Sequence, residues 1–177
     1  GFEKYLSDHR KETNTRRLYL NCIRTMFYHA MDNNVISGAL YPFRGFKIRR
    51  KNPDRPALTI DEIKNLQIGP NLPGQQKAID MFMLSFYLIG TNSKDFLYFT
   101  KKNVRRDRIV FMRAKTERKV EEPLSIRIHP KAKALFDKYK GEGKYMLYFL
   151  ENDDSYEHFK TVTHNFNNRL KSAAKYK

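Results

Sequence analysis

One face of a predicted helix near the N-terminus carries polar residues that suit contacts with a nucleic acid. Arg17, Asn21, Arg24 and Tyr28 recur at intervals of three or four residues within a helical pattern. Arginines two turns apart, flanked by asparagine and tyrosine, match the donors that contact phosphates and base edges. An ordinary solvated helix face has the same composition, so this pattern alone leaves both interpretations open.

A basic segment follows this helix. Residues 47–55 hold five Lys or Arg, and Pro53 and Pro56 flank the end of the run. Proline disfavours helix at the residue before it, so the sequence predicts an extended linker between two domains. Such a segment suits a strap lying across DNA, although basic linkers are also common without a partner.

The net charge of +16 is concentrated in two blocks. Residues 1–56 hold 12 Lys or Arg and 5 Asp or Glu, a net charge of +7, and residues 101–140 hold 14 and 5, a net charge of +9. The stretch between them is nearly neutral and apolar, with 3 basic and 4 acidic residues over 57–100. Two basic blocks around an apolar middle favour a nucleic-acid partner over a charge that serves solubility alone.

Other kinds of chemistry find little support. The chain has no Gly-x-Ser-x-Gly, His-Glu-x-x-His, Walker or dinucleotide-binding motif. Its five histidines lack zinc-like spacing, and the single Cys22 excludes a disulfide framework and a multi-cysteine metal site. We expect no metal and no cofactor. No apolar run reaches membrane-spanning length and no signal pattern is present, so a cytoplasmic, nucleoid-associated protein without a membrane partner is expected.

The first 50 residues are predicted to be all helical. A short amphipathic helix over 2–10 precedes a long one, which begins at a cap on Thr13 or Asn14 and ends near Met31. The predicted core face of the long helix carries apolar residues at three- and four-residue spacing. These are Tyr19, Ile23, Met26, Phe27 and Ala30.

The rest of the chain is predicted to combine helices with a β-hairpin. Thr59 and Glu62 form a capping box, an apolar helix over 75–89 ends at Gly90, and Ser93 caps a short helix. Runs at 109–115 and 120–126 are predicted as the strands of the hairpin. Further helices are expected over 129–140 and 156–174. The predicted fold class is therefore mainly α with a small β-hairpin or sheet, an α+β fold.

The stretch from Phe82 to Ile128 resembles the start of the catalytic domain of tyrosine recombinases, the phage and transposon integrases. In that family an apolar helix, a glycine-centred break, a short helix and a lysine-bearing hairpin follow in this order. Gly90 matches the glycine, Lys115 matches the hairpin lysine, and Asn92 occupies the position of the first arginine. The resemblance divides the chain into a partial helical, SAM-like core-binding domain (1–50), a basic linker (51–56) and the N-terminal portion of a catalytic domain (57–177).

The resemblance implies a role in site-specific DNA recombination and in the integration of a bacterial mobile element. In the family a tyrosine attacks a phosphodiester of double-stranded DNA, fixed cations stabilise the charge on the phosphate, and the hairpin lysine protonates the leaving oxygen. Lys115 and the degenerate Asn92 are thus the catalytic candidates, and the parent enzyme is expected to act as a homo-oligomer on DNA. The candidates for phosphate contacts are all basic: Arg16, Arg17, Arg24, Arg49, Arg50, Lys51 and Arg118.

Two departures from the family pattern bear on activity. The neutral Asn92 cannot form the bidentate, charge-assisted phosphate clamp of an arginine, and Lys94 on the short helix is expected to point elsewhere. The sequence also lacks a His-x-x-Arg motif, and Tyr176 lies too close to the last predicted helix to be the nucleophile. We expect a truncated recombinase that binds DNA without cleaving it. A non-enzymatic DNA-binding regulator of a mobile element is the alternative, and an RNA-binding basic protein is a weaker one.

Overall fold

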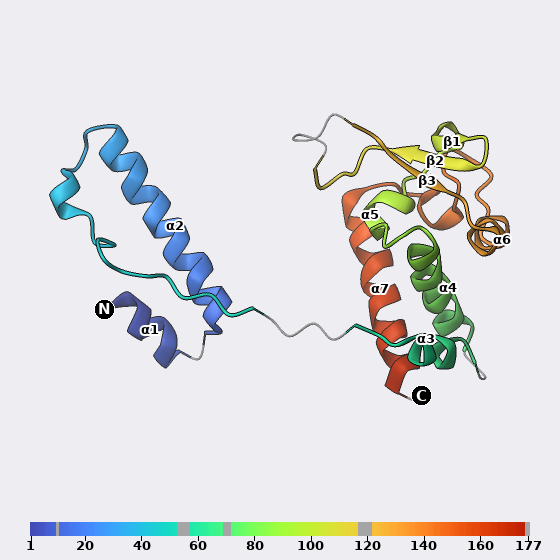
Figure 1. Ribbon diagram of the computed structural model, residues 1–177, viewed down its shortest axis with the longest axis horizontal. Helices are drawn as coiled ribbons and strands as arrows, with labels where there is room; N and C mark the ends of the chain where they lie inside the picture. The colour runs from blue at the N-terminus through green and yellow to red at the C-terminus, as the bar shows by residue number, and fades with distance from the viewer. Residues whose placement is uncertain (10, 53–56, 69–71, 117–121, 176–177) are drawn as a thin grey trace. The chain divides into compact units, whose positions relative to one another are not determined.

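The chain forms two compact units, Gly1–Ala57 and Leu58–Lys177. The computed structural model describes residues 1–9, 11–52, 57–68, 72–116 and 122–175 (Figure 1). These residues are mainly helical and include one small antiparallel sheet, which confirms the expected α+β class at that level. Within them, no helix is both long and apolar enough to cross a membrane.

The first unit consists of two helices and a segment that runs back along the second helix (Figure 1). Helix α1 (Phe2–Asp8) and helix α2 (Thr13–Asp32) are followed by the 3-10 turn η1 (Gly38–Leu40). The predicted side-chain cap of α2 is wrong, because the helix starts after Glu12 with no capping hydrogen bond.

Asn14 binds the returning segment instead of capping its own helix. Its Nδ2 donates to the carbonyl of Lys51 at 2.8 Å, and its Oδ1 accepts from the amide of Lys51 at 3.2 Å. This pair of hydrogen bonds satisfies both backbone groups of Lys51, much as a neighbouring strand would do. Asn14 therefore holds the basic segment beside α2.

The buried face of α2 agrees with the predicted one in part, since Ile23, Phe27 and Ala30 are partly buried. Leu20 is buried, whereas Tyr19 and Met26 are 43% and 69% exposed. Phe27 is partly covered by the returning segment, since its ring centroid lies 6.4 Å from that of Tyr41 and 6.3 Å from that of Phe43. Helical spacing could not show this arrangement, because the covering aromatic rings come from outside the helix.

Helix α4 (Pro73–Tyr87) lies at the centre of the second unit, as its apolar sequence predicts. It packs against α7 (Tyr156–Lys175) and α6 (Pro130–Lys138) (Figure 1). Leu84 and Leu88 are fully buried in the core between these helices and the sheet. The second unit therefore has a continuous apolar core on which surface groups can be fixed.

Helix α3 (Ile60–Gln67) begins with the predicted capping box. The amide of Thr59 donates to the Glu62 carboxylate at 2.7 Å, and the amide of Glu62 donates to Thr59 Oγ1 at 3.2 Å. The hydrogen bond from the Thr59 backbone lowers the pKa of Glu62. This prediction from sequence is confirmed because the capping box is a local interaction.

The sheet has three antiparallel strands in the order β1 (Val104–Arg105), β2 (Arg108–Phe111) and β3 (Leu124–Arg127). The predicted strand over 109–115 is too long, because β2 ends at Phe111 and Lys115 lies in a turn. The chain leaves β2 before Lys115, and the amide of Ala114 donates to the Asp95 side chain at 2.9 Å. Lys115 is therefore presented by a pinned turn and not by a strand end.

Candidate nucleic-acid interface

The second unit has a groove of about 490 Å³ that contains both catalytic candidates from the sequence. One side comes from the break after α4 and from the short helix α5 (Ser93–Phe96), and the other from the chain beyond β2. The lining residues are Gly90, Asn92, Lys94, Asp95, Arg113, Ala114 and Lys115. The fold thus brings together two positions that are 23 residues apart in the sequence.

Two residues with positive φ form the break after α4. Ile89 has a φ of 57° and Gly90 a φ of 73°, and the amide of Gly90 donates to the carbonyl of Ser85 at 2.9 Å. Left-handed residues at a helix end turn the chain and satisfy terminal carbonyls. The predicted stop at Gly90 is confirmed, and it directs the chain into the groove at Asn92.

Asn92 is the N-cap residue of α5. Its Oδ1 accepts a hydrogen bond from the amide of Lys94 at 2.9 Å, so Asn92 and not Ser93 caps this helix. The carbonyl oxygen of the side chain is therefore already bonded, and the group carries no charge. Asn92 can offer a neutral amide donor to a phosphate, which is a weaker partner than a guanidinium.

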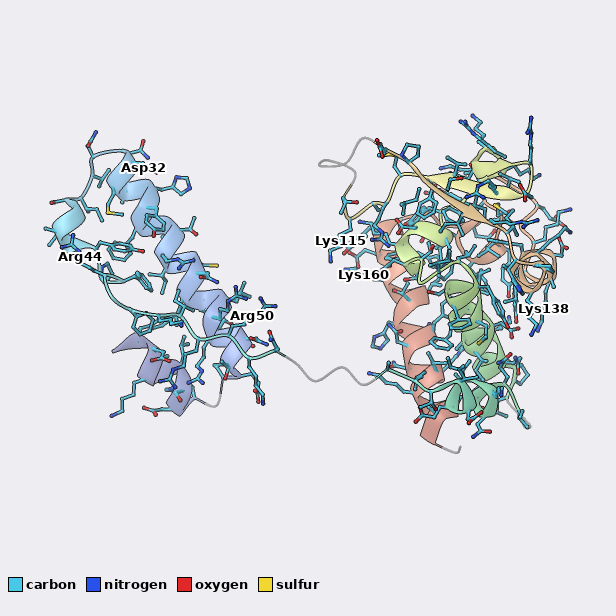
Figure 2. All side chains as sticks on the ribbon, in the orientation of Figure 1. Asp32, Arg44, Arg50, Lys115, Lys138 and Lys160 are labelled. Atoms are coloured by element: carbon cyan, nitrogen blue, oxygen red, sulfur yellow. The ribbon has the colours of Figure 1, made fainter. Side chains whose placement is uncertain are left out.

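Asp95 fixes the opposite side of the groove. It is 7% exposed and accepts the hydrogen bond from Ala114 between Arg113 and Lys115. Lys94, Arg113 and Lys115 are exposed, and the described residues provide no ion-pair partner for any of them. Figure 2 shows Lys115 at the opposite edge of this unit from Lys138 on α6.

The charges of this groove suit a polyanion. Three exposed cations face one buried carboxylate, which leaves an excess of positive charge in a concave surface. Lysine and arginine side chains are the usual donors to phosphate oxygens. The part of the chain that the structure describes contains no cluster of metal ligands.

The first unit has a groove of its own, with a volume of about 410 Å³. Arg17, Asn21 and Arg24 of α2 form one wall, and residues 45–48 of the returning segment, including Lys47, form the other. Three of the four residues of the predicted polar helix face therefore line one concave surface. The remaining one, Tyr28, stacks on Tyr41 at a centroid distance of 5.2 Å. Partial burial, and then a hydrogen bond with Tyr28, raise the pKa of Tyr41.

The other predicted phosphate contacts are more scattered. Arg49, Arg50 and Lys51 are exposed on the returning segment, with Lys51 held through its backbone by Asn14. Arg16 is partly buried and donates to Thr13 Oγ1 at 3.3 Å, so it does not line the groove. Arg118 lies outside the described residues.

Three cations of the two grooves were missed by sequence reasoning. Lys94 lines the groove together with Lys115, so the expectation that it points elsewhere is wrong. Arg113 lies two residues before Lys115, but both follow the end of β2, so only the tertiary structure places them in one groove. Lys47 belonged to the basic run, but only the tertiary structure places it opposite Arg17 and Arg24.

Comparison with protein-family models, with curated proteins and with solved structures found no match to this chain. Inferences about function therefore depend on the two grooves, on their charges and on the sequence pattern.

Proposed function

We propose that this chain binds duplex DNA through the phosphate backbone. The observation that carries this proposal is the groove of the second unit, where Lys94, Arg113 and Lys115 are exposed and have no ion-pair partner among the described residues. The buried Asp95 holds the backbone between Arg113 and Lys115 through the amide of Ala114. Phosphate contacts of this kind give binding that is largely independent of sequence and that weakens with salt. The groove of the first unit adds Arg17, Arg24 and Lys47 to the same chemistry.

The finer proposal is that this DNA binding belongs to a tyrosine recombinase that integrates a mobile element. Its support is the order of elements around Gly90, together with the position of Lys115 beside Asn92 in one groove. In such an enzyme Lys115 would protonate the leaving oxygen, while cations around the phosphate stabilise the developing charge. This role requires Lys115 to reach a phosphate bound beside Asn92.

A non-enzymatic DNA-binding protein is the second candidate, and Asn92 is the observation that favours it. Its side-chain oxygen caps α5, and its amide is neutral. A groove with this residue can hold a phosphate but lacks the charge that stabilises a transition state at that position. Because this sequence lacks a His-x-x-Arg motif, neither candidate predicts a covalent complex between this chain and DNA. The reading frame beyond Lys177 separates the two candidates, since a His-x-x-Arg motif followed by a tyrosine would favour the enzyme and an immediate stop codon would favour the non-enzymatic protein.

The DNA-binding proposal is tested by a salt titration of duplex affinity with a groove variant. The variant replaces Lys94, Arg113 and Lys115 with glutamine. Its binding should be less sensitive to salt, with the magnitude of the slope of log association constant against log salt concentration smaller by about 2 to 3, and its affinity at low salt should fall at least about tenfold. The matched control replaces Lys133, Lys140 and Lys171 with glutamine, which removes the same charge from exposed sites outside the groove. Equal losses in both variants, or an affinity of the unaltered chain that does not depend on salt, would contradict the proposal.

A structured RNA of equal length is the competitor in the same titration. The chain should bind duplex DNA at least about as tightly as the RNA if contacts with the phosphates of B-form DNA dominate. Strong preference for the RNA would favour an RNA-binding protein instead.

A further inference from the structure

Three arginines lie side by side across the sheet. Arg108 of β2 pairs with Arg105 of β1 on one side and with Arg127 of β3 on the other. Side chains of directly paired residues project from the same face of an antiparallel sheet. The three side chains therefore form one row, which we call the arginine row. All three are exposed, and none of them lines the groove of Lys94 and Lys115.

The arginine row lies on the face of the sheet that points away from the core. Ile109, the neighbour of Arg108 in β2, is fully buried in the core, and its partner Ile126 packs against the same core. Helices α4 and α7, which contribute to this core, lie on one side of the sheet (Figure 1). Successive side chains of a strand point to opposite faces, so the arginine row belongs to the other side.

This arrangement costs stability. Like charges directly opposite each other in an antiparallel sheet are destabilising, and Arg108 has an arginine on both sides. Compensation is partial, since Asp107 Oδ2 lies 3.0 Å from Nε of Arg127 in an exposed ion pair. Arg108 has neutral partners, because its Nε and Nη2 donate to the Oγ and the carbonyl of Ser125, each at 2.7 Å. Among the described residues, no carboxylate forms an ion pair with Arg105 or Arg108, so an anion bound across the row would stabilise the sheet.

Further cations flank the arginine row. Lys101 and Lys102 lie in the 3-10 turn η2 (Lys101–Asn103), which leads into β1, and Arg106 lies in the turn between β1 and β2. All three are exposed. Arg106 has a φ of 55°, in the left-handed region that favours glycine or asparagine, so the turn carries a long cation where its backbone favours a small residue. The positive surface thus continues from the row to the edge of the sheet.

The chemistry of this surface fits the phosphates of a duplex. The guanidinium group presents its donors in a fork that matches phosphate oxygens. Single-stranded nucleic acid also uses aromatic platforms for its bases, and a protein partner uses apolar anchors. Between residues 90 and 147 of the described chain, Leu124 is the one large apolar side chain that is exposed, and it lies at the opposite end of β3 from Arg127. Cations without stacking or apolar neighbours match a duplex backbone.

The arginine row and the groove are close enough to contact the same duplex. Arg108 and Lys115 are seven residues apart in the chain, so their Cα atoms lie at most about 25 Å apart. Each base pair of B-form DNA advances about 3.4 Å along the axis, so this separation corresponds to about seven base pairs. One helical turn is longer, at about 34 Å. A single straight duplex of one helical turn is therefore long enough to contact both sites.

We infer that the arginine row is a second phosphate-contact site for the same duplex that the groove holds. The second unit then contacts one DNA molecule over about one helical turn. This inference rests on the proposed function, because the groove must bind the duplex. It adds the outer face of the sheet to the binding surface and assigns the contact there to guanidinium groups.

A salt titration of the full chain with a duplex of about one and a half helical turns, roughly 16 base pairs, tests the inference by fluorescence anisotropy. The row variant carries Arg105→Gln, Arg108→Gln and Arg127→Gln. The matched control carries Lys64→Gln, Lys140→Gln and Lys171→Gln, which removes the same charge from exposed sites outside the row and the groove. A lysine variant, with Arg105→Lys, Arg108→Lys and Arg127→Lys, keeps the charge of the row. Circular dichroism establishes that each variant is folded at the temperature of the measurement.

The row variant should bind with less sensitivity to salt. The magnitude of the slope of log association constant against log salt concentration should be smaller by about 2 to 3, and the affinity at low salt should fall at least about fivefold. The lysine variant should keep the slope within about 1, because charge determines the release of counterions. A row variant that loses no more than the matched control, or a lysine variant that loses as much as the row variant, overturns the inference.

A variant that combines the row and groove substitutions shows whether both sites contact one duplex. In a complex of one chain with one duplex, both sets of contacts are lost together, so the slope changes should add to about 4 to 6. A combined variant that loses no more than the groove variant alone overturns the inference and leaves DNA binding by the groove intact. If the groove variant binds as tightly as its own control, the proposed function fails, and this inference fails with it.

Discussion

The two units hold their cations in different ways. In the second unit, the chain between Arg113 and Lys115 is tied to the buried Asp95, beside a core that includes the fully buried Leu84 and Leu88. In the first unit, one wall of the groove belongs to α2, whose buried apolar residue is Leu20. The segment that forms the other wall is tied to α2 by two exposed hydrogen bonds between the Asn14 side chain and the backbone of Lys51. Similar side chains are thus set on a rigid support in one unit and on a weak support in the other.

This difference has a consequence for binding. The first unit exposes large apolar side chains, and its described residues bury few of them. Regions with few buried apolar contacts open at low free energy, so the cations of this unit lose more conformational entropy when they bind. The second unit should supply most of the affinity, and the first unit should become ordered on DNA. The exposed apolar residues of the first unit include Leu18, Met26, Val35 and Leu40.

The largest effect is expected from removal of core side chains. Leu84→Ala deletes a fully buried side chain in α4 and should lower the free energy of unfolding of the second unit by about 3 kcal/mol. Leu20→Ala, the counterpart in α2, should disorder the first unit without moving the main unfolding transition. Denaturant titration followed by circular dichroism and by amide exchange measures both changes.

Equal effects of the two leucine substitutions on one common transition would show that the units fold together. The contrast between a rigid and a weak support would then be wrong. A substitution of Leu18, which is exposed on α2, serves as the control and should leave both units unchanged.

The next effect concerns the pinned turn of the second groove. Asp95→Ala removes the acceptor for the amide of Ala114 and should cost about 1 to 3 kcal/mol of stability. The Arg113–Lys115 turn should become mobile, and duplex affinity should fall although the net charge becomes more positive. Fluorescence anisotropy with a labelled duplex measures the affinity.

Asp95→Asn is the matched control, because its side-chain oxygen can still accept the same hydrogen bond. It should bind DNA at least as tightly as the unaltered chain, since one negative charge leaves the groove. Tighter binding by both variants would mean that charge alone controls affinity and that the pinned turn has no positioning role.

Sequence reasoning succeeded where the interactions are local. The capping box of Thr59 and Glu62 and the stop at Gly90 are confirmed because neighbouring residues determine them. The length of the strand before Lys115 was wrong, because the hydrogen bond to Asp95 joins positions 19 residues apart. The predicted buried face of α2 is confirmed for Phe27, which Tyr41 and Phe43 contact from outside the helix, but it is wrong for Tyr19 and Met26, which are exposed.

The candidate site was predictable in part. Asn92 and Lys115 were singled out from the order of elements, and they do line one groove. Lys94 and Arg113 complete it only through the packing of α5 against the chain beyond β2, which no periodicity encodes. Whether this groove acts as part of a recombinase stays a prediction.

A smaller effect is expected in the first unit. Asn14→Ala removes both hydrogen bonds to the backbone of Lys51 and should cost about 1 kcal/mol of local stability. Amide exchange of Lys51 should become faster, and duplex affinity should fall by less than about fivefold. Asn21→Ala, which removes an asparagine from the groove wall without breaking this link, is the control for exchange at Lys51. Unchanged exchange at Lys51 in Asn14→Ala would show that the segment is held by other contacts.

The smallest effect is a gain in stability. It is expected in the second unit, because the two units place different residue types in the left-handed region of φ. The first groove uses Gly45 for its left-handed residue, with a φ of 73°, whereas the second places the β-branched Ile89 in that region before Gly90. Ile89 is 79% exposed, so replacing it loses little buried area. Asparagine tolerates a positive φ, and Ile89→Asn should therefore raise the free energy of unfolding by about 0.5 to 1 kcal/mol.

Ile68→Asn is the control for this gain, because Ile68 is similarly exposed but has a φ of −92°. It should show no gain in the denaturant midpoint. Duplex affinity of Ile89→Asn should stay unchanged, since Ile89 does not line the groove. A more stable variant with weaker binding would instead mean that the strained residue itself contacts the DNA, and the rigid support of the second groove would then include part of the binding surface.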